Sequence, residues 1–344
     1  MFAWALSSVR QAQKRGWGDS MASSRKTRKL GRKIGRKIGR KLERQQGGIR
    51  RTKGNPSKGK ARTPQTTLAD APGPNQCFPR RGHVYDGVCL PLDVLEKVSG
   101  KLGLAAASAS QTKRALFSQI AKALGVDAMK QRSVLEAMPL PAAEKTALAA
   151  EWLRPAQPAA WASDPDMWLD TVNIRDVMMQ YEKGRDDFTF LGPYPIDFAA
   201  AEDSGPGRAG TSDRCLIGEM CGLDLKTSKD YIGIIYNLDP HYKSGSHWVA
   251  NFINRPAKTC YYFDSYGMRP PHRVYRFMQW LTIQMPGMEL GWNGRKFQFS
   301  DSECGMYSMY FIDRMLAGEP FLKFCRRAPP DKFMLDMRDW FYST

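Results

Sequence analysis

The distribution of charge divides this chain of 344 residues into two parts. Residues 1–63 hold 20 of the 52 Lys and Arg residues but only two of the 34 acidic residues, so this segment alone accounts for the net charge of +18. Residues 25–41 read RKTRKLGRKIGRKIGRK, with too few apolar side chains to offset the conformational entropy that folding costs. We therefore expect a disordered basic tail over residues 1–63, a linker over 64–76, and a folded body made from the electrically balanced remainder.

The basic tail has the composition of a segment that binds polyanions. Each Lys or Arg that neutralises a phosphate releases a condensed counterion, which favours binding to nucleic acid. No aromatic residues are interleaved within residues 25–41 to stack on bases, so nucleic-acid binding by this segment would not depend on sequence. A tail that only solubilises or localises the protein explains the composition equally well. The candidate contacts to DNA are Arg32, Lys33, Arg36, Lys37, Arg40 and Lys41.

The seven cysteines indicate free thiols in a reducing compartment. They are an odd number, they are widely spaced, and no CxxC pair or group of histidines accompanies them. We expect neither a metal site nor a disulfide framework, and we interpret Cys215 and Cys221 as structural residues. No run of apolar residues reaches the 18 or so that a membrane span requires. Met21 is an alternative start of translation.

The body shows two patterns of apolar residues. Residues 77–155 have helical spacing, which predicts a small helical domain that docks on a partner or on the next domain. Residues 156–344 mix helical segments with short runs rich in β-branched and aromatic residues, which indicates an α+β fold. The expected helices are 172–182, 271–284 and 302–317, and the expected strands are 231–237, 247–254, 259–264 and 294–299.

Cys304 follows a polar turn and opens an apolar helical run. With Asp301 or Ser302 as the N-cap, its sulfur lies in the first helical turn, where the helix dipole favours the nucleophilic thiolate. Gly305 would leave room for a substrate backbone. A lone cysteine is more often a small buried hydrophobic residue, so this feature alone is weak.

A histidine and an aspartate upstream strengthen the interpretation. His247 begins one expected strand and Asp264 ends the next, so the two meet at one end of an antiparallel hairpin. The carboxylate can then orient the imidazole, which can take the proton of the thiol and pass it to a leaving amine. Gln298 and the backbone N–H of Cys304 can donate hydrogen bonds to an oxyanion.

The series His247-Trp248, Asp264-Ser265, Gln298 and Glu303-Cys304-Gly305 resembles the cysteine-protease clan of the adenovirus maturation protease and the proteases of SUMO-like modifiers. Longer strings are similar to the virion-maturation branch of large nucleocytoplasmic DNA viruses, such as that of African swine fever virus. They are WLDTVNIRDVMMQYE (168–182), FLGPYPIDF (190–198) and NLDPHYKSGSHW (237–248). The resemblance covers about residues 165–320.

The resemblance implies a role for each matching residue and a mixed central sheet flanked by helices. His247 would be the base, Asp264 its orienting partner, Cys304 the nucleophile and Gln298 the oxyanion donor. Trp248 would wall the site, and Asn237 would support it. Residues 77–155 would form a helical arm domain and 156–344 the catalytic domain.

The resemblance further implies a viral cysteine endopeptidase that cleaves capsid or core polyproteins after Gly-Gly, in the virion and at the cytoplasmic assembly site. It implies no metal or organic cofactor. The Gly48-Ile49 bond is then a candidate for cleavage by the enzyme itself. A flexible Gly-Gly pair in a disordered segment is the simpler explanation of this sequence.

Several alternatives use the same residues. His241 competes with His247 for the role of the base, but we expect it to be a solvated loop residue. Asp301 and Glu303 would oppose a thiolate if buried, so we expect them to face solvent or to cap the helix. The same fold could instead remove SUMO- or ubiquitin-like modifiers. A non-enzymatic virion protein that binds DNA is a third hypothesis.

Overall fold

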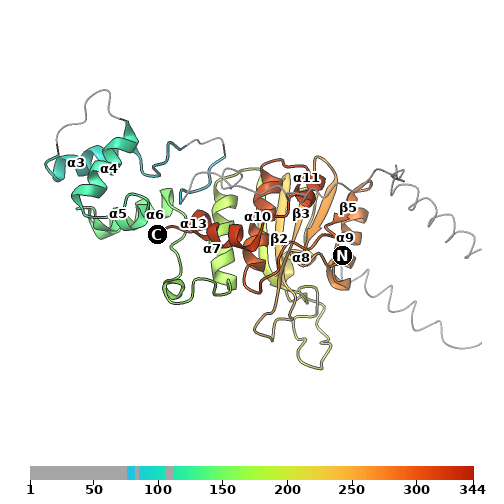
Figure 1. Cartoon of the computed structure of the whole chain (residues 1–344). Helices are drawn as coiled ribbons and strands as arrows, with labels where there is room; N and C mark the ends of the chain where they lie inside the picture. The colour runs from blue at the N-terminus through green and yellow to red at the C-terminus, as the bar shows by residue number, and fades with distance from the viewer. Residues whose placement is uncertain (1–75, 82–84, 105–111) are drawn as a thin grey trace, which may run out of the picture. The chain divides into compact units, whose positions relative to one another are not determined.

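The structure, a computed structural model, describes residues 76–81, 85–104 and 112–344 (Figure 1). The basic tail and its candidate DNA contacts lie outside the described residues. So does the expected linker except for Gln76, which is buried and accepts a hydrogen bond from the backbone of Gln131 through its side-chain oxygen.

The described part of residues 77–155 folds as short helices around a core of its own. That core draws its buried side chains from residues 77–153, as the helical spacing predicts. Gln131 is the main polar residue inside it. Its side chain accepts a hydrogen bond from Cys89 N at 2.8 Å and donates one to Gly87 O at 3.0 Å. The helices, coloured teal to green in Figure 1, are α3 (Leu92–Lys101), α4 (Lys113–Ala123), α5 (Gln131–Ala137) and α6 (Ala142–Trp152).

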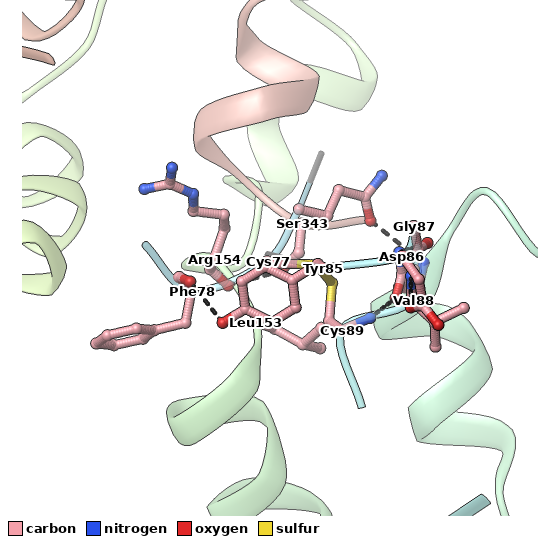
Figure 2. Close-up of a disulfide and its surroundings, with 12 residues drawn as sticks. Cys77, Phe78, Tyr85, Asp86, Gly87, Val88, Cys89, Leu153, Arg154 and Ser343 are labelled. Atoms are coloured by element: carbon pink, nitrogen blue, oxygen red, sulfur yellow. Dashed lines mark hydrogen bonds between the residues drawn. A yellow bond between two sulfur atoms is a disulfide. The ribbon is translucent and has the colours of Figure 1, made fainter. Parts of the chain in front are cut away.

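Two disulfides correct the expectation that all cysteines remain thiols. Cys77 is bonded to Cys89, and Cys215 to Cys221. Figure 2 shows the first bond beside Tyr85, whose hydroxyl donates to Phe78 O at 2.8 Å. Both bonds close short loops, with sequence separations of 12 and 6, which the sequence pattern did not distinguish from unpaired structural cysteines.

A five-stranded mixed sheet forms the centre of residues 156–344. The strand order is β1-β2-β3-β4-β5, with parallel pairs at the two edges and antiparallel pairs between β2, β3 and β4. The strands are β1 (Phe188–Pro195), β2 (Tyr231–Asn237), β3 (Trp248–Asn254), β4 (Thr259–Phe263) and β5 (Glu289–Trp292). The predicted α+β class with a mixed sheet is confirmed.

Both faces of the sheet are covered, so its central strands are mostly apolar and almost fully buried. Ala250 and Phe252 of β3 pack into the core that contains α7 (Thr171–Lys183) and α10 (Cys304–Leu316). Val249 and Ile253, which point to the opposite face, pack into the core that contains α9 (His272–Gln284). Helix α10 lies against β2 and β3, and α7 lies against the edge strand β1 and α10 (Figure 1).

Further helical segments complete the described body: η2 (Ala159–Ala162), α8 (Gly218–Cys221), α11 (Phe321–Arg326), α12 (Asp331–Asp336) and α13 (Arg338–Phe341). None of the described helices is long and apolar enough to cross a bilayer. Helix α7 begins with a capping box, in which Asp170 and Asn173 bind each other's backbone N–H groups.

The strand expected at 294–299 is absent, and β1 and β5 were missed. Phe297 N and Gln298 N both donate to Ser265 O, at 2.7 and 2.9 Å. The segment therefore turns past the end of β4 rather than pairing along a strand, and its backbone holds Gln298 beside Ser265.

Candidate active site

The β3–β4 hairpin brings His247 and Asp264 together. Ala250 pairs with Phe263, so the residue before β3 and the residue after β4 meet at the same end of the hairpin. His247 Nε2 lies 2.8 Å from Asp264 Oδ1, and both residues are buried. The carboxylate can therefore fix the orientation of the ring.

Two further residues hold Asp264 and His247 in place. Tyr266 N donates to Asp264 Oδ1 at 2.8 Å, and the Tyr266 ring stacks on the imidazole with centroids 4.6 Å apart. Asn293 accepts a hydrogen bond from Asp264 N and donates one to Asp264 O. The sequence analysis missed Asn293, because an asparagine before a glycine looks like an ordinary turn residue.

Cys304 is the first residue of α10 and is buried beside the histidine. Its side chain hydrogen-bonds to His247, so Cys304, His247 and Asp264 form one connected series. Burial lowers the pKa of His247, but the hydrogen bonds to Asp264 and Cys304 outweigh burial and raise it from 6.5 to about 9. A protonated imidazole beside sulfur stabilises a thiolate.

The start of α10 differs from the expectation in one respect. The N-cap is Glu303 rather than Asp301 or Ser302, and its side chain makes no capping hydrogen bond. Glu303 is also buried rather than solvent-facing, and it is paired with Arg338 at 2.6 Å. Asp301 is exposed, as expected.

Gln298 lies fully buried on the segment that turns past Asp264. Its Oε1 accepts from Ser265 Oγ at 2.7 Å, and its Nε2 donates to Ser300 O at 2.8 Å. Asp331 fixes the same segment, because it accepts hydrogen bonds from Phe299 N and Ser300 N. The amide of Gln298 has a second N–H, which is the donor that an oxyanion would use.

Asn237 supports the loop that leads to His247. It ends β2, and its Oδ1 accepts hydrogen bonds from Asp239 N and Ser246 N, at the two ends of the loop. Leu238 N also donates to His247 O. Asn237 is thus placed to fix the loop rather than to react.

A cleft of about 420 Å³ lies next to this loop. Trp248 forms part of its wall, and the indole N–H donates to Leu169 O at 2.9 Å. This bond joins the hairpin to the segment before α7. Other residues that line the cleft are Trp168, Pro193, Asn237, His241 and Lys243.

The chain resembles known proteases in sequence and in fold. Residues 222–338 match the Ulp1 protease family, C-terminal catalytic domain. The matched residues include Cys304, His247 and Asp264. This part of the chain is thus similar to the catalytic domain of Ulp1-type cysteine proteases. The relationship expected from the sequence motifs, including the viral branch, is confirmed.

The proteins that this chain is similar to include viral ones. It is 32% identical over 164 residues to the R355 protein of Acanthamoeba polyphaga mimivirus, covering 45% of this chain and 49% of that one. It is 30% identical over 125 residues to the cysteine protease S273R of African swine fever virus (strain Badajoz 1971 Vero-adapted), covering 34% and 45%. The chain thus spans about half the length of these relatives.

The fold is also that of a solved viral structure. The crystal structure of the African swine fever virus pS273R protease covers 80% of this chain and 99% of its own, with a TM-score of 0.52 and 18% sequence identity. This similarity shows the architecture, including the helices before the sheet.

Of two further expectations about residues near this site, the one about Gly305 is wrong. A Cβ on Gly305 would lie 3.0 Å from the Leu169 side chain and 3.3 Å from Ile174, so this glycine permits packing of α10 rather than approach of a substrate. His241 is an exposed loop residue, as expected, and its Nδ1 lies 2.8 Å from the buried carboxylate of Asp197. It lines the cleft and makes no described contact with Cys304.

The raised pKa of His247 gives a direct prediction. An NMR titration of the His247 ring is expected to have its midpoint near pH 9. Asp264→Asn removes the carboxylate that favours the imidazolium, so the midpoint should move to lower pH. Asp301→Asn, at an exposed acid on the neighbouring turn, is the control and should leave it in place. An equal midpoint in wild type and Asp264→Asn would contradict this account.

Proposed function

We propose that this chain is a cysteine endopeptidase whose nucleophile is Cys304. The observation that carries the proposal is the connected series of Cys304, His247 and Asp264, assembled from the start of α10 and the end of one hairpin. These are the residue types that nucleophilic thiol catalysis requires, in hydrogen-bonding contact.

Each step of peptide hydrolysis then has a residue. His247 takes the thiol proton, and the sulfur of Cys304 attacks the scissile carbonyl carbon. The second N–H of Gln298 and the backbone N–H of Cys304 donate to the oxyanion. When the C–N bond breaks, the imidazolium protonates the leaving amine and a thioester remains. His247 then takes a proton from water, hydroxide adds to the thioester, and the thiolate leaves and is reprotonated.

The proposed substrate is a polypeptide with Gly-Gly before the scissile bond. The side chains of Trp168 and Trp248 both line the cleft beside the loop that leads to His247. Glycine has no side chain, so it can pass between such walls where larger residues cannot. By resemblance to the viral branch, we propose that the substrates are viral capsid or core polyproteins, processed in the virion and at the cytoplasmic assembly site.

Peptide mapping by mass spectrometry tests this function. Wild type and Cys304→Ser are each mixed with a peptide containing Gly-Gly-Xaa and with a matched peptide containing Ala-Ala-Xaa. Cleavage after the second glycine, by wild type only, is the expected result. Failure of wild type to cleave any Gly-Gly peptide would overturn the proposal.

Removal of a small protein modifier is the second candidate, because a relative in African swine fever virus is named SUMO-1 cysteine protease S273R. Both functions use a Gly-Gly end, so the contacts at Cys304 do not separate them. Covalent labelling by a SUMO or ubiquitin C-terminal probe, in the absence of peptide cleavage, would favour this candidate. If neither reagent reacts, the non-enzymatic alternative is favoured.

The basic tail is proposed to hold the enzyme near packaged DNA. Deleting residues 1–63 removes the whole net positive charge, so affinity for duplex DNA should fall and lose most of its dependence on salt. Cleavage of a short Gly-Gly peptide should stay within about twofold of wild type, because the series of Cys304 lies within residues 156–344. Fluorescence anisotropy at two salt concentrations measures the binding. Unchanged DNA affinity would contradict this role.

A further inference from the structure

Arg338 is a buried cation that no step of the mechanism uses. It begins α13, and its side chain and that of Glu303 are only 3% and 2% exposed. The guanidinium donates to both carboxylate oxygens of Glu303, from Nη2 at 2.6 Å and from Nε at 3.3 Å. Two hydrogen bonds in one plane fix direction as well as distance.

The same guanidinium also binds a second segment. Its Nη2 donates to Met167 O at 2.8 Å, and its Cζ lies 4.3 Å from the centroid of the Trp161 ring. Met167 directly precedes Trp168 and Leu169, which line the cleft, and Leu169 O holds the indole of Trp248. One side chain therefore contacts both the residue before the nucleophile and the residue before the cleft wall.

The charge of Arg338 also matters at this position. A buried carboxylate one residue from Cys304 would oppose a thiolate if it had no partner. Burial raises the pKa of Glu303, Arg338 and the Ser302 hydroxyl act to lower it, and the charge of Asp166 acts to raise it. His247, which hydrogen-bonds to the Cys304 side chain, can supply another positive charge near the sulfur. Arg338 thus supplies the charge that balances Glu303.

We propose that Arg338 is a positioning residue that fixes the nucleophile end of α10 relative to the 167–169 wall of the cleft, and so places the substrate backbone over Cys304. The substrate part of this inference rests on the proposed function. The link between the two segments does not, so it can be tested separately.

The first test uses Arg338→Lys, which keeps the charge but cannot bind both Glu303 oxygens and Met167 O in one plane. Loss of a hydrogen bond to a charged group corresponds to roughly a tenfold effect, so KM for a Gly-Gly peptide should rise about tenfold with a smaller change in kcat. Hydrogen exchange of segments 164–170 and 299–306 should accelerate together. The matched control is Arg314→Lys, in an Arg–Glu pair at the other end of α10 with Arg314 Nε 2.9 Å from Glu319 Oε2, and it should change neither measurement.

The second test separates the charge from the geometry. Arg338→Met leaves Glu303 without its partner, whereas Glu303→Gln with Arg338→Met removes both charges. At alkaline pH, where a lone carboxylate ionises, iodoacetamide should alkylate Cys304 more slowly in the single variant than in the double variant. Because both variants lose the bond to Met167 O, the raised KM should persist in the double variant.

Two results would overturn the proposal. One is normal exchange of 164–170 together with a normal KM in Arg338→Lys. The other is an equal response of Arg314→Lys, which would indicate a general effect on α10. If wild type cleaves no peptide, the proposed function fails, and the exchange comparison still decides whether Arg338 links the two segments.

Discussion

Cys304→Ala is expected to abolish peptide cleavage, with kcat falling by roughly 10⁴- to 10⁶-fold, as for other nucleophiles of catalytic triads. The reason is that the thiol supplies the attacking atom, and an alanine methyl group has no lone pair to replace it. Cys304 is packed in a core with Trp248 and Leu169. Alanine removes only the sulfur atom from this core, so the fold should stay intact. The measurement is kcat for a Gly-Gly peptide, with circular dichroism to confirm folding.

The chain offers matched controls in its two other free cysteines. Burial raises the pKa of Cys260 to about 12 and that of Cys325 to about 11, so both remain protonated at neutral pH. Neither has a histidine partner among the described contacts. Cys325→Ala should therefore retain full activity, and iodoacetamide should modify only Cys304 at pH 7. Loss of activity in Cys325→Ala, or a stable Cys304→Ala variant that still cleaves, would refute the assignment.

Gln298→Ala should have the second largest effect, a loss of about 10²- to 10³-fold in kcat with little change in KM. The bonds to Ser265 and Ser300 fix the amide of Gln298. In the proposed mechanism, its second N–H donates to the carbonyl oxygen only when that oxygen becomes negative. Stabilisation that appears only in the transition state raises kcat rather than the affinity for the ground state.

Comparing two reactions at the same sulfur separates loss of the oxyanion donor from a change in the packing of Cys304. Alkylation of Cys304 by iodoacetamide forms no oxyanion, so its rate in Gln298→Ala should stay close to wild type while kcat falls. Gln279→Ala, at an exposed glutamine of α9, is the control for removal of a glutamine side chain. Equal losses in alkylation and cleavage would show that Gln298 supports the packing of Cys304 instead.

The sequence allowed the hairpin and the start of α10 to be predicted, because each depends on local pattern. Two strands joined by a short turn pair antiparallel, which brings the residue before the first strand, His247, next to the residue after the second, Asp264. The partners of Glu303 could not be predicted in this way. Arg338 lies 35 residues later, and only the packing of α13 against the start of α10 brings their side chains within 2.6 Å.

The contacts of Asn293 and the position of β5 could not be predicted from local pattern either. Residues 294–299 have the composition of a strand, but their backbone N–H groups bind Ser265 O, which lies outside the sheet ladder. The cysteines of the two disulfides are separated by loops with no distinctive spacing. For Asn293 and residues 294–299, a contact distant in sequence, rather than local propensity, decided the structure.

In a newly made chain, the residues of the Cys304 series come from two elements that must pack together during folding. His247 and Asp264 come from one hairpin of 18 residues, which can form on its own local contacts, whereas Cys304 reaches them only when α10 packs on β3. A partly folded polypeptide therefore carries a base without its nucleophile. Under the proposed function, cleavage activity should therefore appear only after α10 has packed on the sheet.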